Sequence, residues 1–165
     1  MATPEAMTEG VRLAERDDEH RCAELCLQGL NEVQQRRGGA LLARREVDLV
    51  ATALTRPGGL QRLGTDPRRR VLVGTIDDAV VGVLVARVDD VRGTPLGVVE
   101  VCYVEPAARG VGVGRAMLDE AVRWFAAAHC LGADVAALPG DRAAKQFLEA
   151  SGFTARSITM HRSLP

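Results

Sequence analysis

Apolar residues recur along this chain at two spacings, which separate helical from extended segments. Spacings of three and four residues predict a helix that starts after Asp17–Asp18 and ends at Gly38–Gly39. The same spacing predicts a second helix over Val47–Leu54, which ends before Pro57 because a residue preceding proline avoids the helical conformation. A broad apolar face over Met117–Phe125 predicts a third helix.

Extended segments dominate the middle of the chain. Val71–Ile76 and Ala79–Val88 are rich in β-branched residues and flank an Asp-Asp turn, so they predict a β-hairpin. The polar stretch Asp89–Pro95 is expected to be a loop. Gly97–Val104 then predicts a further strand of the central sheet.

Shorter elements are expected towards both ends. Val11–Ala14 predicts a short strand, and Leu131–Leu138 predicts a buried one. Asp141–Ser151 predicts a short helix that Asp141 caps, and Ile158–His161 is expected to belong to a final strand. The order of these elements predicts a mixed α/β (α+β) fold with a core sheet of five or six strands.

Length and composition indicate one globular domain. The chain has 165 residues, of which 47% are hydrophobic and 26% charged, and a chain of this length can bury about 70% of its unfolded surface. We expect a flexible tail at residues 1–10 and a single domain over residues 11–165.

Charge and cysteine content narrow the class of protein. The 21 Lys and Arg residues against 22 Asp and Glu residues give a formal net charge of −1, which argues against a nucleic-acid partner. The longest apolar run, Ala79–Ala86, is too short to span a membrane. Residues 1–10 contain no readable export signal, so we expect a cytoplasmic protein whose four cysteines are reduced thiols.

The most informative segment is a glycine-rich turn between a predicted strand and a predicted helix. It reads Arg109-Gly110-Val111-Gly112-Val113-Gly114-Arg115. Glycines let the backbone approach a ligand closely, and the first N–H groups of a helix lack internal partners, so the turn suits a diphosphate. Its spacing fits neither the G-x-G-x-x-G dinucleotide motif nor a Walker loop.

The same segment resembles the acetyl-CoA-binding motif of the GNAT acetyltransferase family. The motif residues are Arg109-x-x-Gly112-x-Gly114, preceded by Val104-x-Pro106 and followed downstream by Asp141-x-x-Ala144 and by Gly152-Phe153. These motifs extend over about residues 97–153. The resemblance implies a GNAT-like domain in which helices flank a mixed central sheet, with the strand ending near Val104 and the strand from Leu131 splayed apart around an acetyl-CoA cleft.

The resemblance also implies where acetyl-CoA binds. The backbone of Cys102, Tyr103 and Val104 would pair with pantetheine as an added strand does. The amides from Gly110 through Val111, Gly112, Val113 and Gly114 to Arg115 would bind the diphosphate. Arg109 and Asp141 are assigned to the cofactor site because they occupy the first positions of the two motifs. No metal is expected.

Glu100 is the candidate catalytic residue. It lies in an apolar strand, and period-two alternation places it on one face with Cys102 and Val104. Partial burial would suit it to act as a general base, and some family members use an acid from this strand. The alternative is an ordinary glutamate on the solvated face of the sheet.

The family's frequent general acid, a tyrosine seven residues after the start of the second motif, is replaced here by Leu148. A thiol with a pKa of about 8.5 leaves readily as thiolate, so this departure does not prevent turnover. Tyr103, the only tyrosine, could substitute, although packing is its simpler role.

Other residue patterns favour structural roles. Cys22 and Cys26, with nearby His20, have the spacing of a partial metal site but also lie on an apolar helix face. Cys102 could act as a covalent nucleophile, although no spacing relates it to a histidine base. The arginine runs at residues 36–37, 44–45 and 68–70 are expected to be solvated, with a few free to meet the cofactor's phosphates.

Together these features predict an acetyl-CoA-dependent N-acetyltransferase. An amine acceptor, either a small molecule or a peptide, would attack the thioester directly in a ternary complex. The alternative is a non-catalytic acyl-CoA-binding or regulatory module. Only twelve residues follow Phe153, so the acceptor pocket is either open or completed by a second subunit in a homodimer.

Overall fold

The computed structural model describes residues 8–165, apart from the side chains of Glu46 and Asp48. Its strands are β1 (Glu9–Leu13), β2 (Arg69–Ile76), β3 (Ala79–Val91), β4 (Thr94–Val104) and β5 (Ala133–Val135). Its α-helices are α1 (Glu19–Gln34), α2 (Gly39–Leu42), α3 (Asp48–Thr55), α4 (Gly59–Gly64), α5 (Val113–Ala127) and α6 (Arg142–Ala150). A π-helical turn at Ala43–Val47 joins α2 to α3, and 3-10 turns occupy Arg16–Asp18 and Pro106–Ala108.

The five strands form one mixed sheet in the order β1-β2-β3-β4-β5. The pairs from β1 to β4 are antiparallel, and β4 pairs with β5 in parallel. This arrangement confirms the predicted mixed α/β fold with a five-stranded sheet.

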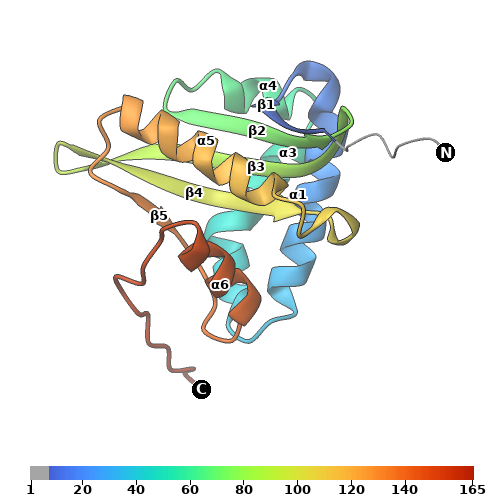
Figure 1. The fold of residues 1–165 in the computed structure, drawn as a ribbon. Coiled ribbons are helices and arrows are strands. Elements are labelled where there is room, and N and C mark those ends of the chain that lie inside the picture. The colour runs from blue at the N-terminus through green and yellow to red at the C-terminus, as the bar shows by residue number, and fades with distance from the viewer. Residues whose placement is uncertain (1–7) are drawn as a thin grey trace.

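Helices cover both faces of this sheet (Figure 1). Each face has its own apolar core. Core A lies between the sheet and helices α1, α3 and α4, and includes Leu25, Cys26, Val73, Val83 and Val85. Core B lies between the sheet and helices α5 and α6, and includes Leu84, Met117, Leu118, Phe125 and Leu148. Because valines alternate with small or apolar residues along β2 and β3, both faces of these strands are buried.

The first strand begins earlier than the sequence pattern suggested. Glu9 and Gly10, expected in the tail, belong to β1, where Glu9 pairs with Ile76 and Gly10 with Thr75. Thr8 continues the contact, since its N–H donates to Asp77 Oδ1 at 2.9 Å. Residues 1–7, the rest of the expected tail, lie outside the described part of the chain.

The predicted polar loop at Asp89–Pro95 is wrong. The β3–β4 hairpin continues to the pair Val91 and Thr94, and only Arg92 and Gly93 form the turn. Both turn residues have positive φ, 53° and 83°, as tight hairpin turns require. The polar residues mark the solvated end of a long ribbon rather than a break in pairing.

The helical region before β2 contains more elements than the two predicted helices. The expected helices correspond to α1 and α3, while the short helices α2 and α4 were not anticipated. Gly38 and Gly58, with φ of 78° and 70°, precede these two short helices. Across residues 8–165, no helix has the length and apolar character needed to cross a bilayer.

The last third of the chain has less regular structure than predicted. Of the expected strand Leu131–Leu138, only Ala133–Val135 pairs, and Leu131 is 82% exposed. Ile158–His161 forms no strand, and Ile158 and Met160 are 80% and 88% exposed. Both expected strands are therefore wrong in extent: the first is much shorter than predicted, and the second does not form.

Candidate active site

A cavity of about 960 Å³ opens between β4 and β5, which is large enough for a small-molecule ligand. The two strands pair only over Gly97–Val99 and Ala133–Val135, and they diverge beyond this contact. The diverging parts, Glu100–Val104 and 136–138, line the cavity. Every second residue of β4 directs its N–H and C=O groups away from β3, so this edge can pair with an extended ligand.

The structure brings the predicted site residues together around this cavity. Cys102, Tyr103 and Val104 line it from β4, Glu100 lines it nearer the paired region, and Asp141 lines it from the start of α6. The glycine-rich turn lines it at the start of α5, through Arg109, Gly110, Gly112, Val113, Gly114 and Arg115. Val111 is the exception, since its side chain packs against core B instead.

A β-bulge at Glu100 changes the face that this side chain occupies. Val101 and Val99 pair with adjacent residues of β3, so Glu100 has no residue opposite it. The extra residue shifts the alternation of side chains by one position. Val101 accordingly packs in core A, whereas Val99 packs in core B.

Glu100 therefore does not share a face with Cys102 and Val104, and that expectation is wrong. Cys102 and Val104 pack against core B. Glu100 instead forms ion pairs with Arg69 and Arg87, which lie opposite each other on β2 and β3. Val71 and Val85, two positions from these arginines, belong to core A, so Glu100 lies on the α1 side of the sheet.

The Glu100 carboxylate is nearly buried, with only 6% of its side chain exposed. Arg87 Nη1 donates to Glu100 Oε1 at 2.8 Å, and Arg69 Nη1 donates to Oε2. Arg87 also donates to both oxygens of Asp89, at 2.7 and 3.1 Å. These opposite charges compensate the desolvation of the buried carboxylate, which would otherwise be costly.

The glycine-rich turn presents backbone N–H groups to the other end of the cavity. Gly110 and Gly112 have φ of 86° and 102°, which side chains rarely tolerate. Gly112 precedes α5, and the first helical hydrogen bond runs from Ala116 N–H to Gly112 O at 2.9 Å. The N–H groups of residues 113–115 thus have no partner within the helix, and the positive end of the helix dipole lies there. This donor set fits a diphosphate.

Helix α6 packs against the start of α5 and completes this end of the cavity. A Cβ added to Gly114 would lie 3.2 Å from Phe147 Cζ, so glycine permits the close approach of the two helices. Arg115 Nη1 donates to Ala150 O at 2.7 Å and ties the two helices together. Leu148, at the position of the family's tyrosine, is 9% exposed and belongs to core B.

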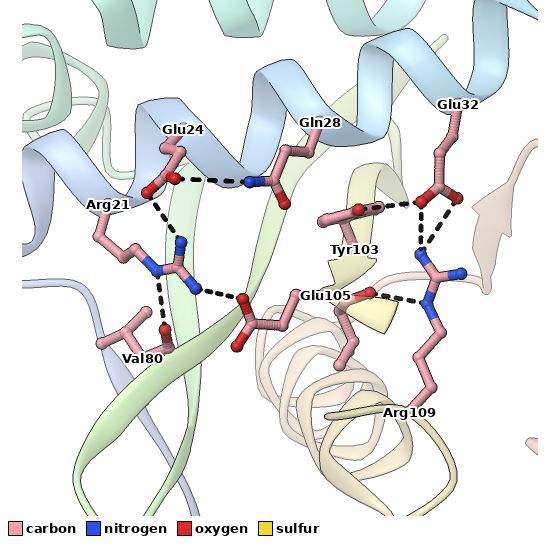
Figure 2. A network of polar contacts seen from close by, with 9 residues as sticks. Arg21, Glu24, Gln28, Glu32, Val80, Tyr103, Glu105 and Arg109 are labelled. Atoms are coloured by element: carbon pink, nitrogen blue, oxygen red, sulfur yellow. Dashed lines mark hydrogen bonds and ion pairs between the residues drawn. The ribbon is translucent and has the colours of Figure 1, made fainter. Parts of the chain in front are cut away.

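The side chain of Arg109 points towards helix α1 (Figure 2). Its Nη2 donates to both carboxylate oxygens of Glu32, at 2.9 and 3.1 Å, and its Nε donates to Val104 O at 2.8 Å. Tyr103 Oη donates to Glu32 Oε1 at 2.9 Å, and the guanidinium lies over the Tyr103 ring. Burial and the hydrogen bond to Glu32 raise the pKa of Tyr103.

A second ion pair joins Arg36, four residues after Glu32, to Asp141, and both residues line the cavity. Arg36 Nε lies 3.2 Å from Asp141 Oδ2, while Asp141 Oδ1 accepts the Ala144 N–H at 3.1 Å. Asp141 thus caps α6, as predicted, and also contacts the segment that follows α1. Sequence analysis predicted neither ion pair, because the partners are distant in sequence, 77 residues apart for Glu32 and Arg109.

Several arginines expected to be solvated have specific partners. Arg36 pairs with Asp141, Arg69 with Glu100, and Arg70 lies over the Trp124 ring at 5.0 Å from its centroid. Two of these contacts, Arg36 with Asp141 and Arg69 with Glu100, hold residues that line the cavity. The third joins β2 to helix α5.

The cysteines with metal-like spacing lie in the core. Cys22 and Cys26 are fully buried in core A, whereas His20 is exposed, so the three side chains do not converge. Burial raises the pKa of both thiols to about 12. Cys102, which lines the cavity, also has its pKa raised to about 12 by burial.

Fold and cavity together place the chain among the acyltransferases that use coenzyme A thioesters. The model of the acetyltransferase (GNAT) family matches residues 51–153. The chain therefore belongs to this family of N-acetyltransferases, whose enzymes use acetyl-CoA. Among curated proteins, none has a significantly matching sequence.

Solved structures share the fold at low sequence identity. The aminoglycoside N-acetyltransferase AAC(6')-Iy in complex with CoA has a TM-score of 0.74 at 16% identity, covering 98% of this chain and 99% of that one. A glucosamine-6-phosphate N-acetyltransferase from Arabidopsis thaliana has a TM-score of 0.66 at 15% identity, covering 96% and 99%. A transcriptional regulator from Bacillus halodurans C-125 has a TM-score of 0.68 at 18% identity, covering 94% and 100%.

Proposed function

We propose that the protein transfers an acetyl group from acetyl-CoA to an amine acceptor by direct attack within a ternary complex. The observation that carries this proposal is the cavity itself. Its β4 edge, a glycine-lined helix start and a buried carboxylate all face one space between diverging strands. Family membership supports acetyl transfer as the reaction class.

The cofactor would lie along the edge of β4. Backbone groups of Cys102, Tyr103 and Val104 would pair with pantetheine, and the N–H groups from Gly110 to Arg115 would bind the diphosphate. Asp141 would contribute by holding the first turn of α6 at the cavity wall. The thioester would then lie towards the bulge, where β4 and β5 begin to diverge.

Glu100 is proposed as the proton acceptor for the attacking amine. The amine nitrogen forms a bond to the acetyl carbon, the carbon–sulfur bond breaks, and the proton lost from nitrogen passes to the Glu100 carboxylate, directly or through water. The bulge directs Glu100 to the α1 side of the sheet, where Val47 and Leu42 also line the cavity. Coenzyme A leaves as a thiolate, since a thiol pKa of about 8.5 makes it a good leaving group.

A covalent acetyl-enzyme on Cys102 is disfavoured. The nucleophilic form of cysteine is the thiolate, and burial raises the pKa of Cys102 to about 12. At neutral pH the thiol would be almost wholly protonated, so direct attack by the acceptor is the simpler route.

The acceptor is proposed to be a primary amine, with amino sugars as the first class to test. Two structural neighbours are named as N-acetyltransferases of an aminoglycoside and of glucosamine 6-phosphate, and both acceptors carry sugar amines. Carboxylates line the cavity in this protein, but those of Glu32, Glu100 and Asp134 are each engaged by an arginine. A cationic acceptor would have to compete with these guanidinium groups.

A non-catalytic acyl-CoA-binding or regulatory module is the second candidate. Two observations favour it: Leu148 provides no acid at the family's tyrosine position, and two arginines hold the carboxylate of Glu100. One neighbour of similar fold is named as a transcriptional regulator.

Mass spectrometry separates the two candidates. The purified full chain would be incubated with acetyl-CoA and a panel of aminoglycosides, amino sugars, amino acids and peptides, beside reactions without enzyme that measure spontaneous acetylation. An acetylated product with stoichiometric release of free CoA supports the transferase. Calorimetric binding of CoA without any product favours the module, and absence of CoA binding overturns both.

A further inference from the structure

Glu32 and Arg109 connect the helix on one face of the sheet to the turn at the cavity's far end. Arg109 Nη2 donates to both Glu32 oxygens, at 2.9 and 3.1 Å, although 77 residues separate the two positions in sequence. Figure 2 shows the two side chains meeting beside Tyr103, which also donates to Glu32. All three residues line the cavity.

The Glu32 end of this connection is fixed by close packing. Helix α1 buries Leu25, Cys26 and Leu30 in core A. Gly29, one turn before Glu32, lies so close to the ring of Tyr103 that an added Cβ would be 3.1 Å from its Cδ2. This packing fixes the helix backbone that carries Glu32 beside Tyr103.

The Arg109 end belongs to a segment with little intrinsic rigidity. Gly110 and Gly112 follow Arg109, and glycine loses more conformational freedom on ordering than any other residue. The Arg109 side chain is held by Glu32, by Val104 O and by the Tyr103 ring. These contacts lie on one side of the turn, and the backbone amides that follow remain for a ligand.

We propose that Glu32 is a positioning residue for the acyl donor. By holding Arg109 it orders the start of the glycine-rich turn, so that the amides of residues 110–115 are arranged before the diphosphate arrives. This inference rests on the proposed function, because it assumes that the diphosphate binds at this turn. Glu32, which lies on α1 outside both sequence motifs, would thereby contribute to the affinity for coenzyme A.

Loss of Glu32 has two opposing effects on the affinity for CoA, and the inference predicts which one is larger. Loss of Glu32 would leave the turn less ordered, which weakens binding of a diphosphate. The same loss would release the Arg109 guanidinium, which could then contact the diphosphate and strengthen binding. The inference requires the first effect to exceed the second.

The test is isothermal titration calorimetry of CoA with the full-length protein and a double-mutant cycle. Glu32→Gln is expected to raise the Kd of CoA about 3- to 10-fold, the range expected when one ordered side chain loses its partner. Arg109→Gln is expected to have a similar effect, and Glu32→Gln is expected to add nothing further in the Arg109→Gln background. Glu24→Gln is the matched control, since Glu24 lies on the same helix and pairs with Arg21.

A second ligand distinguishes positioning of the turn from general damage to the site. Pantetheine lacks the diphosphate, and its binding, followed by ligand-observed NMR, is expected to be the same for wild type and Glu32→Gln. Tyr103→Phe, which removes only the hydroxyl that contacts Glu32, provides a milder variant and is expected to weaken CoA less than Glu32→Gln does.

Three results would overturn the inference: unchanged or tighter CoA binding by Glu32→Gln, additive losses in the double mutant, or equal weakening of CoA and pantetheine. Failure of the proposed CoA site gives a different result, because wild-type protein then shows no heat of binding with CoA at all. CoA binding without acetylated product removes the proposed transfer reaction but leaves this test of Glu32 intact.

Discussion

Arg87 Nη1 lies 2.8 Å from Glu100 Oε1 and joins the bulge of β4 to the neighbouring strand β3. The hydrogen bonds from Arg87 to Asp89, together with the charge of Glu100, raise the pKa of Arg87 above its ordinary value. The arginine therefore stays charged at any pH used for an assay. Arg87 on β3 and Arg69 on β2 both pair with Glu100 and hold it at the cavity.

Replacement of Glu100 by glutamine separates proton transfer from cofactor binding. We expect Glu100→Gln to lower turnover about 10²-fold or more, because amide nitrogen and oxygen do not take the amine proton. CoA affinity, measured by calorimetry, should be unchanged. Asp89→Asn, which alters the other acidic partner of Arg87, is the control and should change turnover by less than about threefold. Equal rates of wild type and Glu100→Gln across the pH range would remove Glu100 from the reaction.

Gly112 is the position in the turn where a side chain should do most harm. Its φ is 102°, and an added Cβ would lie 2.8 Å from Glu9 Oε2. We expect Gly112→Ala to lower the free energy of unfolding by about 1–2 kcal/mol and to weaken CoA binding at least tenfold. Urea denaturation and calorimetry measure the two effects.

The matched control for Gly112 is Gly64 in α4. An added Cβ there meets nothing within 4 Å, so Gly64→Ala should leave CoA binding unchanged and alter stability by at most about 1 kcal/mol. If both alanine variants bind CoA like wild type, the turn does not hold the diphosphate.

Asp18 makes the stability of the fold dependent on pH. It accepts hydrogen bonds from Arg12 at 2.6 and 3.0 Å and from the Glu15 N–H at 2.7 Å, and those from Arg12 hold its pKa below the ordinary value. A lowered pKa in the folded state means that the contribution is fully present above the pKa of the unfolded chain, about 4. It is lost as the pH falls through the lower, folded value.

We therefore expect Asp18→Asn to reduce the free energy of unfolding by about 1–3 kcal/mol at pH 7, and by progressively less below about pH 4. Urea unfolding at pH 7, 5 and 3 measures this difference. Glu149→Gln, which removes an exposed ion pair with Lys145, is the control and should cost less than about 0.5 kcal/mol. A difference that stays constant with pH would show that the ion pair is not its source.

The rate at which each cysteine is alkylated depends on the pKa and burial of its thiol. Burial raises the pKa of Cys22, Cys26 and Cys102 to about 12, so these thiols should resist iodoacetamide in the native protein at pH 8. Cys102 and Cys130 are both only partly buried, and Cys130, whose pKa is raised less, should react first. Intact-mass spectrometry should find one modification per native chain and four after denaturation. Rapid native labelling of Cys102 would reopen the covalent route.

The sequence pattern was sufficient to identify the central strands of the sheet, and the family resemblance implied the cavity between β4 and the segment that contains β5. Alternating and continuous apolar runs identified β2, β3 and β4, since burial on both faces leaves a strong signal. The glycine spacing identified the start of α5, because positive φ restricts those positions to few residue types.

Features that depend on tertiary context were missed. The bulge at Glu100 inserts a residue into an otherwise regular pattern, and nothing local marks that position. The pairs Glu32–Arg109 and Arg36–Asp141 join distant segments whose meeting follows from the fold. The strand expected at Ile158–His161 has the right alternation, but strand formation also requires a partner edge, which the alternation itself does not supply.

The brief parallel contact between β4 and β5 has a kinetic consequence. Since only Gly97–Val99 and Ala133–Val135 pair, the neighbouring edge of β4 is already parted from β5 in the free protein. An arriving thioester donor would exchange its hydrogen bonds with water and would not have to break strand pairs. Association should then proceed in a single bimolecular phase whose observed rate rises linearly with donor concentration, without the plateau that a slow opening step imposes.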